Sequence, residues 1–574
     1  MDLEASMLER IEGWVDPPSA DEADDAEELA RYLSDFLPEG RGQALEAEGK
    51  FPELELRAFA ERGLTRRLAP PELGGCLEWS RAMRICARLA EHDLDVTLCL
   101  GGAVLGAIPV LVAGSAEQRA RYFGPLLAGE MGGLALSEWE HGSDLLGIAT
   151  RAVGEDEGGA ECPPEQAVAF RLSGEKAPIN NATRGRNLVV LARTSPGKGP
   201  DPFALSLFLI PADAEGLTPL PRFPSIGYRT MDLSGIRMEG ARVPASALLG
   251  KVGEGFVLVR RSLEISRSGV ATMAVGPHAR ILSLALAHAR SRVLYGAPVA
   301  ELGAARRLLT GIFARLVLSA AMARRASHAV AHFPGAARAH TSAAKLLCPS
   351  LLEESVHDAG TLLGARSLME DLPFARLRRS APVLAIFDGS SQLQLDELYR
   401  HAASWAPPGT LSPEEATSLG KALREPSARF DADAEDRAGL LARTGPAALL
   451  GAHEAHLTGA PLPRIAELVA MAAREARGHG QPVKHRVSEL VAELQGIASL
   501  LDALSLSDGD AKEPLDAALA LVLATRGARM AETLVILGRA MDSPALNDLA
   551  PSLLQLAAGR PDAEERAWRV VQTL

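Results

Sequence analysis

The chain has few aromatic residues and no excess of positive charge. Aromatic residues make up 4% of its 574 residues, and its formal net charge is −13. Nucleic-acid-binding proteins need a basic surface and often stack aromatic rings on bases, so this composition argues against that class of function. With 47% hydrophobic and 23% charged residues, the sequence is typical of a folded globular protein rather than of a disordered one.

Cysteine is also scarce. The five cysteines are an odd number, and no two of them stand in a CxxC spacing. We therefore expect reduced thiols rather than a disulfide framework or a zinc site. Histidines in helical segments, such as His278, His288 and His357, lack the spacing of metal ligands, so packing or surface roles are expected for them and no metal is predicted.

Targeting and membrane signals are weak. The first residues read MDLEASMLERIEGWVDPP, which is acidic and lacks the basic and apolar regions of a signal peptide. The longest apolar run, from Gly101 to Gly114, is shorter than the roughly 20 residues that span a bilayer as a helix. We therefore expect a cytoplasmic bacterial protein without an integral membrane segment.

Three hydrophobic patterns follow one another along the chain. Residues 1–132 show helical periodicity, at Ala23–Leu37, Leu54–Glu61 and Arg81–Glu91. Residues 133–245 hold β-type segments separated by Gly, Pro, Asn and Asp clusters, at Ala167–Leu172, Leu188–Ala192, Ala204–Ile210 and Ile236–Arg242. Residues 246–404 return to long amphipathic stretches that favour a four-helix bundle, at Phe256–Tyr295, Ala304–His332 and Ala337–Leu363.

Residues 405–574 form a fourth segment. Pro407–Pro408–Gly409 is typical of a linker, and Ser412–Pro413 is typical of a helix start. Amphipathic patterns at Ile465–Ala476 and Leu515–Val535 predict further helices. The predicted fold is mostly α with a central antiparallel β domain: an N-terminal helical domain (1–132), the β domain (133–245), a four-helix bundle (246–404) and an extra helical domain (405–574).

Five short motifs carry the chemistry. They read ALSEWEHGSDLLG from Ala135, LSGEKAPINNATRGRNLVVLART from Leu172, RSGVATMAVG from Arg267, SRVLYG from Ser291 and IFDGSSQLQ around Asp388. In this order and spacing, the series resembles the acyl-CoA dehydrogenase family over roughly two-thirds of the chain, from Ala44 to Ala403. In the first motif, only His141 departs from the small residue that the family usually has.

The resemblance implies a flavin enzyme. Family members bind FAD between the β domain and the bundle, with a neighbouring subunit touching the adenosine end. An acyl thioester lies across the flavin, a carboxylate removes its α-proton, and a hydride passes from the β-carbon to the flavin. Such a proton is weakly acidic, so the base must lie within hydrogen-bond reach and the developing enolate must be stabilised.

The resemblance also assigns cofactor positions in the β domain. It implies that Leu134, Leu136 and Ser137 line the flavin, and that Ser143 approaches the phosphate or the substrate. Pro178 and Asn180 stand where the family usually has a tryptophan and a threonine or serine beside the ring. On this basis Asn180 is expected to donate a hydrogen bond to the reactive flavin nitrogen, while the lost tryptophan opens the ring to solvent or oxygen.

Further positions are implied in the bundle. Arg292 matches the arginine that reaches a partner subunit's FAD phosphates, Tyr295 matches the neighbouring aromatic residue, and Arg267 matches an arginine beside the active site. For both arginines, a solvated helix charge is the alternative. Thr361–Ala365 stands where a Gln-x-x-Gly-Gly run usually grips the partner's FAD. The assigned cofactor residues of this part are Gly364, Arg366, whose charge could compensate for the methyl group of Ala365, and Ser390.

Asp388 is the expected base, because it falls where the family has its catalytic glutamate. The other base position known in the family holds Ser266 here, and Glu264 points to another helix face. Aspartate is one methylene shorter than glutamate, and one branch of the superfamily, which resembles nitroalkane oxidases, does use aspartate. The alternative is that Asp388 only caps the helix that begins near Ser390.

Three functions remain open at this point. The first is an FAD-dependent dehydrogenase of acyl thioesters, tethered to coenzyme A or to an acyl carrier protein, with electron-transfer flavoprotein or oxygen as acceptor. The second is a flavin oxidase or oxygenase on the same scaffold. The third is a non-catalytic interaction protein. Residues 405–574 could be a second core packed on the bundle, a membrane-surface patch or a docking face for a carrier protein; we favour the packed core, and with it a homodimer.

Overall fold

The computed structural model describes residues 6–195, 197, 199–333, 337–403, 450, 462–507 and 509–574. It divides into two compact units. The sheet unit comprises Asp24–Glu78 and Asp93–Ser266. The bundle unit comprises Met1–Ala23, Trp79–His92 and Arg267–Leu574, as far as these are described. The linker at Pro407–Pro408–Gly409 and the helix start at Ser412 that the sequence predicts lie outside the described residues.

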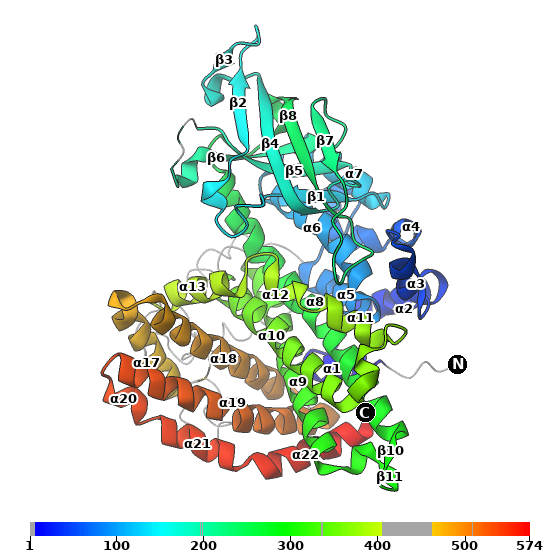
Figure 1. Ribbon diagram of the computed structural model, residues 1–574, viewed down its shortest axis with the longest axis vertical. Helices are drawn as coiled ribbons and strands as arrows, with labels where there is room; N and C mark the ends of the chain where they lie inside the picture. Colours follow the sequence, from blue (N-terminus) through cyan, green and yellow to red (C-terminus); the bar gives the residue numbers. More distant parts are fainter. Residues whose placement is uncertain are drawn as a thin grey trace. The chain divides into compact units, whose positions relative to one another are not determined.

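The described part of the sheet unit holds a nine-stranded sheet in the order β7-β8-β4-β2-β5-β6-β9, with β1 beside β5 and β3 beside β2 (Figure 1). The strands are β1 (Gly132–Ala135), β2 (Arg151–Glu155), β3 (Glu161–Cys162), β4 (Ala169–Asn180), β5 (Asn187–Arg193), β6 (Leu205–Pro211), β7 (Leu217–Leu220), β8 (Leu233–Pro244) and β9 (Leu248–Leu249). Every residue of β5 is buried, as its Leu- and Val-rich sequence predicts.

The sheet is mixed, whereas the sequence predicts an antiparallel one. β1 pairs in parallel with β5, and β2 makes one parallel contact with β5. Parallel neighbours require a long crossover connection, and β2, β3 and β4 lie between β1 and β5 in the chain. β1 is not predicted from the sequence, because four buried residues without alternation carry no strand periodicity.

β4 runs further than the sequence predicts. The expected strand ends at Leu172, but β4 continues to Asn180 and pairs with β8 along most of its length. Its register with β8 shifts between Leu172 and Ser173 and again after Lys176. Such irregularities allow a strand to pass residues that interrupt regular pairing. The extension brings Lys176 and Asn180 into the sheet.

In its described part, the sheet unit also holds the helices α2 (Ala20–Phe36), which starts in the bundle unit, α3 (Arg41–Glu48), α4 (Glu53–Glu61), α6 (Leu94–Ala113) and α7 (Ala116–Leu127). α6 packs on β1 and β5. It is longer than the predicted apolar run and, with a mean hydropathy of 2.3, is long and apolar enough to cross a membrane. α8 (Gly255–Ser291) passes the same test. Since 67% and 78% of their apolar windows are buried in the structure, both are also typical of core helices.

The bundle unit is built from long helices. Its elements are α1 (Met7–Val15), α5 (Trp79–His92), most of α8, the hairpin β10 (Val293–Leu294) and β11 (Ala297–Pro298), α9 (Gly303–His332), α10 (Arg338–Leu363), α11 (Pro373–Ser380), α12 (Val383–Ile386), α13 (Ser391–Ala402), α17 (Leu462–Glu475), α18 (Gln481–Leu506), α19 (Lys512–Ala540), α20 (Pro544–Asn547), α21 (Ala550–Ala558) and α22 (Arg560–Thr573). The three long amphipathic stretches predicted for this region correspond to α8, α9 and α10.

The C-terminal helices pack directly on the bundle. α18 contacts α9, α10 and α13, while α19 and α22 contact α9, as can be followed in Figure 1. The helices predicted at Ile465–Ala476 and Leu515–Val535 are α17 and α19. The described part of residues 405–574 therefore enlarges the core of the bundle unit.

Candidate active site

Asp388 lies in the link between α12 and α13, in an unusual backbone conformation. Its φ is +60°, and that of Gly389 is +91°. Aspartate is among the few residues other than glycine that tolerate the left-handed region, and such residues gather at functional sites. The N-cap position of α13 belongs to Ser390. Asp388 therefore does not occupy the cap position that the alternative interpretation gave it.

The turn at Gly389 is closely packed. The side-chain amide of Gln394, which is fully buried, donates from Nε2 to the Gly389 carbonyl at 3.0 Å. A Cβ atom on Gly389 would lie 2.8 Å from that nitrogen and 3.1 Å from Leu393 Cδ2. The backbone that carries Asp388 is thus fixed from α13, one turn further along the chain.

Arg267 lies in the same neighbourhood. This α8 residue is 5% exposed, and its Nη1 donates to the Ser342 hydroxyl on α10 at 3.1 Å. Its Nη2 would be 3.5 Å from a Cβ atom on Gly389. The alternative of a solvated helix charge is therefore wrong for Arg267. The guanidinium is a buried cation beside the turn that carries Asp388.

The structure adds a second buried cation, Lys345 on α10, which the sequence analysis missed. Its side chain is 1% exposed, and Nζ donates to the Leu384 carbonyl at 2.7 Å and lies 5.9 Å from the centroid of the Phe387 ring. Burial lowers the pKa of Lys345 to about 8, while the charge of Asp388 acts in the opposite direction and that of Arg267 adds to the lowering. A single lysine in the apolar run SAAKLLCPSLL was the signal available in the sequence.

In the sheet unit, the first motif is organised around Glu138. Its carboxylate accepts hydrogen bonds from the amides of Ala149 at 2.7 Å and Thr150 at 2.9 Å and from the fully buried ammonium of Lys176 at 2.9 Å. Lys176 also donates to the Leu136 carbonyl at 2.9 Å. Burial lowers the pKa of Lys176 to about 8 against the opposing charge of Glu138. This buried pair fixes the backbone on both sides of Ser137.

The predicted flavin residues of the sheet unit differ in exposure. Leu134 and Leu136 are buried, Ser137 is half-buried, and Ser143 and Pro178 are exposed. The contact of these residues with the flavin stays a prediction.

The side-chain amide of Asn180 is partly engaged within the sheet unit. One N–H of its Nδ2 donates to the Leu98 carbonyl on α6 at 2.9 Å, and the second N–H of the amide leaves the expected donation to flavin a prediction. Its Oδ1 is buried and has no hydrogen-bond partner within the part of the chain that the structure describes. Buried polar atoms are nearly always satisfied. A ligand N–H would satisfy this oxygen, and the isoalloxazine ring carries both donor and acceptor groups, so the residue fits a flavin as an acceptor.

The remaining predicted cofactor residues lie at the surface of the bundle unit. Arg292 and Tyr295 are exposed at the β10–β11 hairpin, and Tyr295 is 96% exposed. Gly364 and Arg366 are exposed at the end of α10, and Ser390 is half-buried. Gly364 and Thr361 help to line a cavity of about 560 Å³ whose other lining residues are Glu353, Val356, His357, Gly360, Arg378, Ala381 and Pro382. The contact of these residues with a partner's FAD stays a prediction.

Comparison with known proteins settles the family. Three family models match in order: the N-terminal domain of acyl-CoA dehydrogenases at residues 20–130, the middle domain at 133–241 and the C-terminal domain at 253–403. Together they cover more than half of the chain. The chain belongs to the acyl-CoA dehydrogenase family. The family consists of FAD-dependent oxidoreductases that act on the CH–CH bond of acyl-CoA, which confirms the predicted enzyme class and cofactor.

Relatives and solved structures agree with this membership. The mitochondrial short-chain specific acyl-CoA dehydrogenase of Bos taurus is 29% identical over 361 residues, which is 61% of this chain and 82% of the relative. The FAD complex of an acyl-CoA dehydrogenase from Bacillus anthracis is 19% identical and has a TM-score of 0.77; the match covers 100% of this chain and 98% of that one. The prolyl acyl carrier protein oxidase AnaB is 22% identical with a TM-score of 0.60, covering 67% of this chain and 99% of that one. The acyl-CoA dehydrogenase fold of this chain, C-terminal helices included, is therefore shared with a solved structure.

Proposed function

We propose that the chain is an FAD-dependent dehydrogenase of acyl thioesters in which Asp388 is the catalytic base. The observation that carries the proposal is the left-handed turn at Asp388–Gly389, packed against buried Arg267 and held by Gln394. When bound, FAD supplies the acceptor for the hydride that leaves the β-carbon of the substrate. The product is the α,β-unsaturated thioester.

The proposed acceptor of the substrate's α-proton is a residue of this chain. The α C–H bond breaks, and its proton passes to the Asp388 carboxylate. A carboxylate at the position of the family's glutamate reaches one methylene less far, and a misplacement of about 1 Å can lower a rate roughly 100-fold. The left-handed conformation of Asp388 sets the direction in which the short side chain leaves the backbone. We infer that this fixed turn, rather than side-chain length, brings the carboxylate to the α-carbon.

The sheet unit supports the cofactor side of the proposal. Glu138 and Lys176 hold the backbone around Ser137, and the buried acceptor of Asn180 lacks a partner in the described structure. Leu134 and Leu136 add apolar surface. We propose that these residues hold the flavin of the same chain, whereas Arg292, Tyr295, Gly364 and Arg366 serve a partner's FAD.

Substitution of Asp388 tests the proposal. Asp388→Asn keeps the size and removes the proton-accepting power, so bound flavin should persist while anaerobic flavin reduction by the acyl thioester falls at least ~100-fold, as expected for a positioned general base. Asp388→Glu should also be slower, because the extra methylene overshoots a turn built for aspartate.

The matched control for this experiment is Asp396→Asn. It removes a carboxylate on α13 that pairs with His485 at 2.9 Å, and it should leave reduction within about twofold of the wild type. Undiminished anaerobic reduction in the Asp388→Asn variant would remove Asp388 from the mechanism.

A flavin oxidase or oxygenase is the second candidate. The exposed proline at position 178 favours access of oxygen to the ring, and AnaB, an oxidase of a prolyl acyl carrier protein, shares the fold. Anaerobic reduction by coenzyme A thioesters and by acyl carrier protein thioesters, followed by exposure to oxygen, separates the two. Reoxidation within the turnover time supports the oxidase; slow reoxidation that electron-transfer flavoprotein accelerates supports the dehydrogenase.

Three further proposals concern the oligomeric state, the location in the cell and the relation to membranes. We propose a homodimer, a cytoplasmic location and no integral membrane segment. The FAD-dependent function predicts that the purified protein carries flavin or takes it up. An absorption spectrum after incubation with FAD, together with the shift in melting temperature that a bound ligand causes, decides this point.

A further inference from the structure

We infer that Lys345 is a positioning residue for Asp388: it anchors the segment that carries the carboxylate and adds a buried cation beside that segment. This inference rests on the proposed function, because it assigns a partner to the proposed base. It concerns a residue to which neither the motifs nor the resemblance gave a role.

The anchor is the contact with Leu384. The ammonium of Lys345 donates to the Leu384 carbonyl at 2.7 Å, and Leu384 belongs to α12, the short helix directly before Phe387 and Asp388. Nζ also lies 5.9 Å from the Phe387 ring centroid. Two residues of the short segment that leads to the base are therefore held by one side chain from α10. Gln394 holds the same segment from the other end, at the Gly389 carbonyl.

The electrostatic part follows from burial. An ammonium that is 1% exposed is expensive to keep charged unless negative groups face it. The groups that act on Lys345 are Asp388 and Glu353, which favour its charged form, and Arg267, which disfavours it. Because such interactions are mutual, the lysine favours the ionised carboxylate, which is the form that accepts a proton.

The two roles predict different results for two substitutions. Lys345→Met removes both the donor and the charge. Lys345→Gln removes the charge but keeps a donor that can reach a carbonyl. If both roles hold, the acid limb of the pH profile of flavin reduction should move to higher pH by about 1 unit in both variants, since the carboxylate loses a nearby cation. The rate at the optimum should fall at least ~10-fold in Lys345→Met, because the segment is no longer anchored, and Lys345→Gln should recover most of that loss.

A matched control separates positioning from general stability. Arg325 is a buried cation of the same unit, 6% exposed, that pairs with Asp502. Arg325→Met should lower the melting temperature of the holoenzyme and leave the pH profile of reduction unchanged. If the control moves the acid limb as far as the lysine variants do, or if Lys345→Met and Lys345→Gln have the wild-type limb, the inference is overturned.

A readout without turnover keeps this test distinct from that of the proposed function. Melting temperatures of the wild type, Lys345→Gln, Asp388→Asn and the double variant form a thermodynamic cycle. We expect Lys345→Gln to destabilise the wild type more than it destabilises Asp388→Asn. This non-additivity would establish the pair even if no thioester reduced the flavin, which would defeat the proposed function alone. Strictly additive shifts would defeat the role of Lys345 even in an active enzyme.

Discussion

A single backbone position decides how Asp388 is presented. Gly389 has a φ of +91°, a conformation that side chains with a Cβ atom adopt only with strain. It also receives the amide of Gln394 on its carbonyl. Glycine at this site therefore permits both the left-handed turn and the close approach of the Gln394 side chain. It also allows the preceding aspartate to keep its own left-handed conformation.

We predict that Gly389→Ala lowers the free energy of unfolding by about 1–3 kcal/mol and slows flavin reduction more than it weakens flavin binding. The new Cβ atom would lie 2.8 Å from Gln394 Nε2, so the amide must leave the carbonyl that it holds. Denaturant unfolding and stopped-flow reduction measure the two effects. Gly509→Ala is the control, because Gly509 has a φ of +58° and nothing within 4 Å of its Cβ position. Equal losses in both variants would show that backbone strain alone is at work.

At this scale, sequence reasoning located the residues of the motifs but not their partners. Asp388 and Arg267 stand at fixed spacings, so a resemblance could place them. Lys176 and Lys345 become significant only because apolar segments distant in the chain close around them. The orientation of Asn180 depends on the approach of α6, where a Cβ atom on Gly102 would come within 2.3 Å of its Nδ2. Such contacts are tertiary, and no local pattern encodes them.

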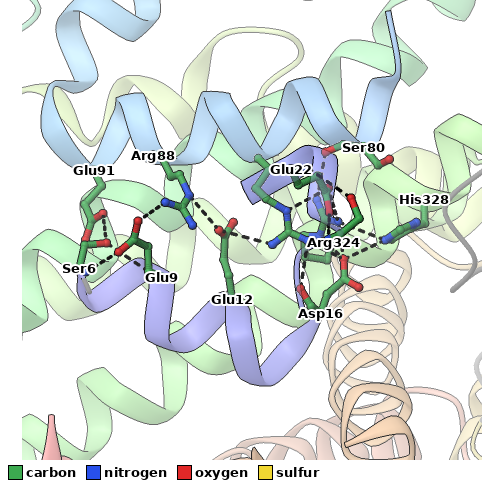
Figure 2. Close-up of polar contacts among 12 residues, drawn as sticks. Ser6, Glu9, Glu12, Asp16, Glu22, Ser80, Arg88, Glu91, Arg324 and His328 are labelled. Carbon is green, nitrogen blue, oxygen red and sulfur yellow. Dashed lines mark hydrogen bonds and ion pairs between the residues drawn. The ribbon is translucent and has the colours of Figure 1, made fainter. Parts of the chain in front are cut away.

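Among the elements, α1 is held by charges that face it from two other helices. Figure 2 shows these contacts. Asp16, at the end of α1, pairs with Arg324 and with His328 at 3.1 Å, both on α9. At the N-terminal end of α1, the Ser6 hydroxyl and the Leu8 amide donate hydrogen bonds to the Glu91 carboxylate of α5, at 2.9 Å and 3.1 Å. The carboxylate thus satisfies a backbone donor in the first turn of α1.

The two carboxylates make α1 sensitive to pH in opposite directions. Burial raises the pKa of Glu91 to about 7. Its stabilising contribution is therefore complete below its unfolded value near 4.5 and is lost as the pH rises through about 7. Burial acts on Asp16 as well, but Arg324 and His328 outweigh it and hold the pKa of that carboxyl far below its usual range. Its contribution is present above about 4 and is lost in acid.

We predict that Glu91→Gln changes the pH dependence of stability. The amide cannot ionise, so the variant should lose the decline that the wild type shows between about pH 4.5 and 7, by up to about 3 kcal/mol. Below pH 5 the variant should be the less stable protein, because one amide oxygen replaces two carboxyl oxygens at the start of α1. Thermal unfolding across this range is the measurement, with the exposed residue Glu565 changed to glutamine as a control. Parallel curves for Glu91→Gln and the wild type would contradict the assignment.

Elements with a clear period were predictable, and those without one were not. α8, α9 and α10 match their predicted stretches because one face of each repeats apolar residues over many turns. α6 lacks such a face, since it is apolar on nearly all sides, and the sequence showed only part of it. The predicted strand ended before β4 does, because a strand that pairs irregularly with β8 keeps no strict alternation of apolar and polar residues.

For the whole molecule, the question is whether the C-terminal helices belong to the core. Buried polar contacts join them to the bundle. Arg526 of α19 is 4% exposed and pairs with Glu354 of α10 and Glu493 of α18, both at 3.1 Å. Gln495 of α18 bonds His340 of α10 at 2.7 Å. A docking module or a membrane-surface patch does not require such ties between α10, α18 and α19.

We predict that removal of one of these ties weakens the whole unit. Arg526→Met keeps the length of the chain but removes the buried cation that lies 3.1 Å from the half-buried Glu493, and breaking a buried pair costs up to about 3–5 kcal/mol. The melting temperature should fall although no residue of the proposed site has changed, and flavin reduction at low temperature should be retained. Arg529→Met is the matched control, because Arg529 pairs with the same Glu354 but is exposed. Similar small effects of both substitutions would show that the tie contributes little.

Truncation after Ala403 tests the same idea at full scale. α18 packs on α9, α10 and α13, and fully buried residues such as Leu494, Leu501 and Leu515 contribute to this core. Removing the helices would expose a continuous apolar face on the bundle. The truncated protein should therefore aggregate or melt well below the full chain, and bound FAD should not restore its melting temperature.

Size-exclusion chromatography with light scattering and thermal melting distinguish this outcome from the alternative. A soluble truncated protein with the melting temperature and oligomeric state of the full chain would instead identify residues 405–574 as a separate docking module, since only a module with its own core can leave the bundle unchanged.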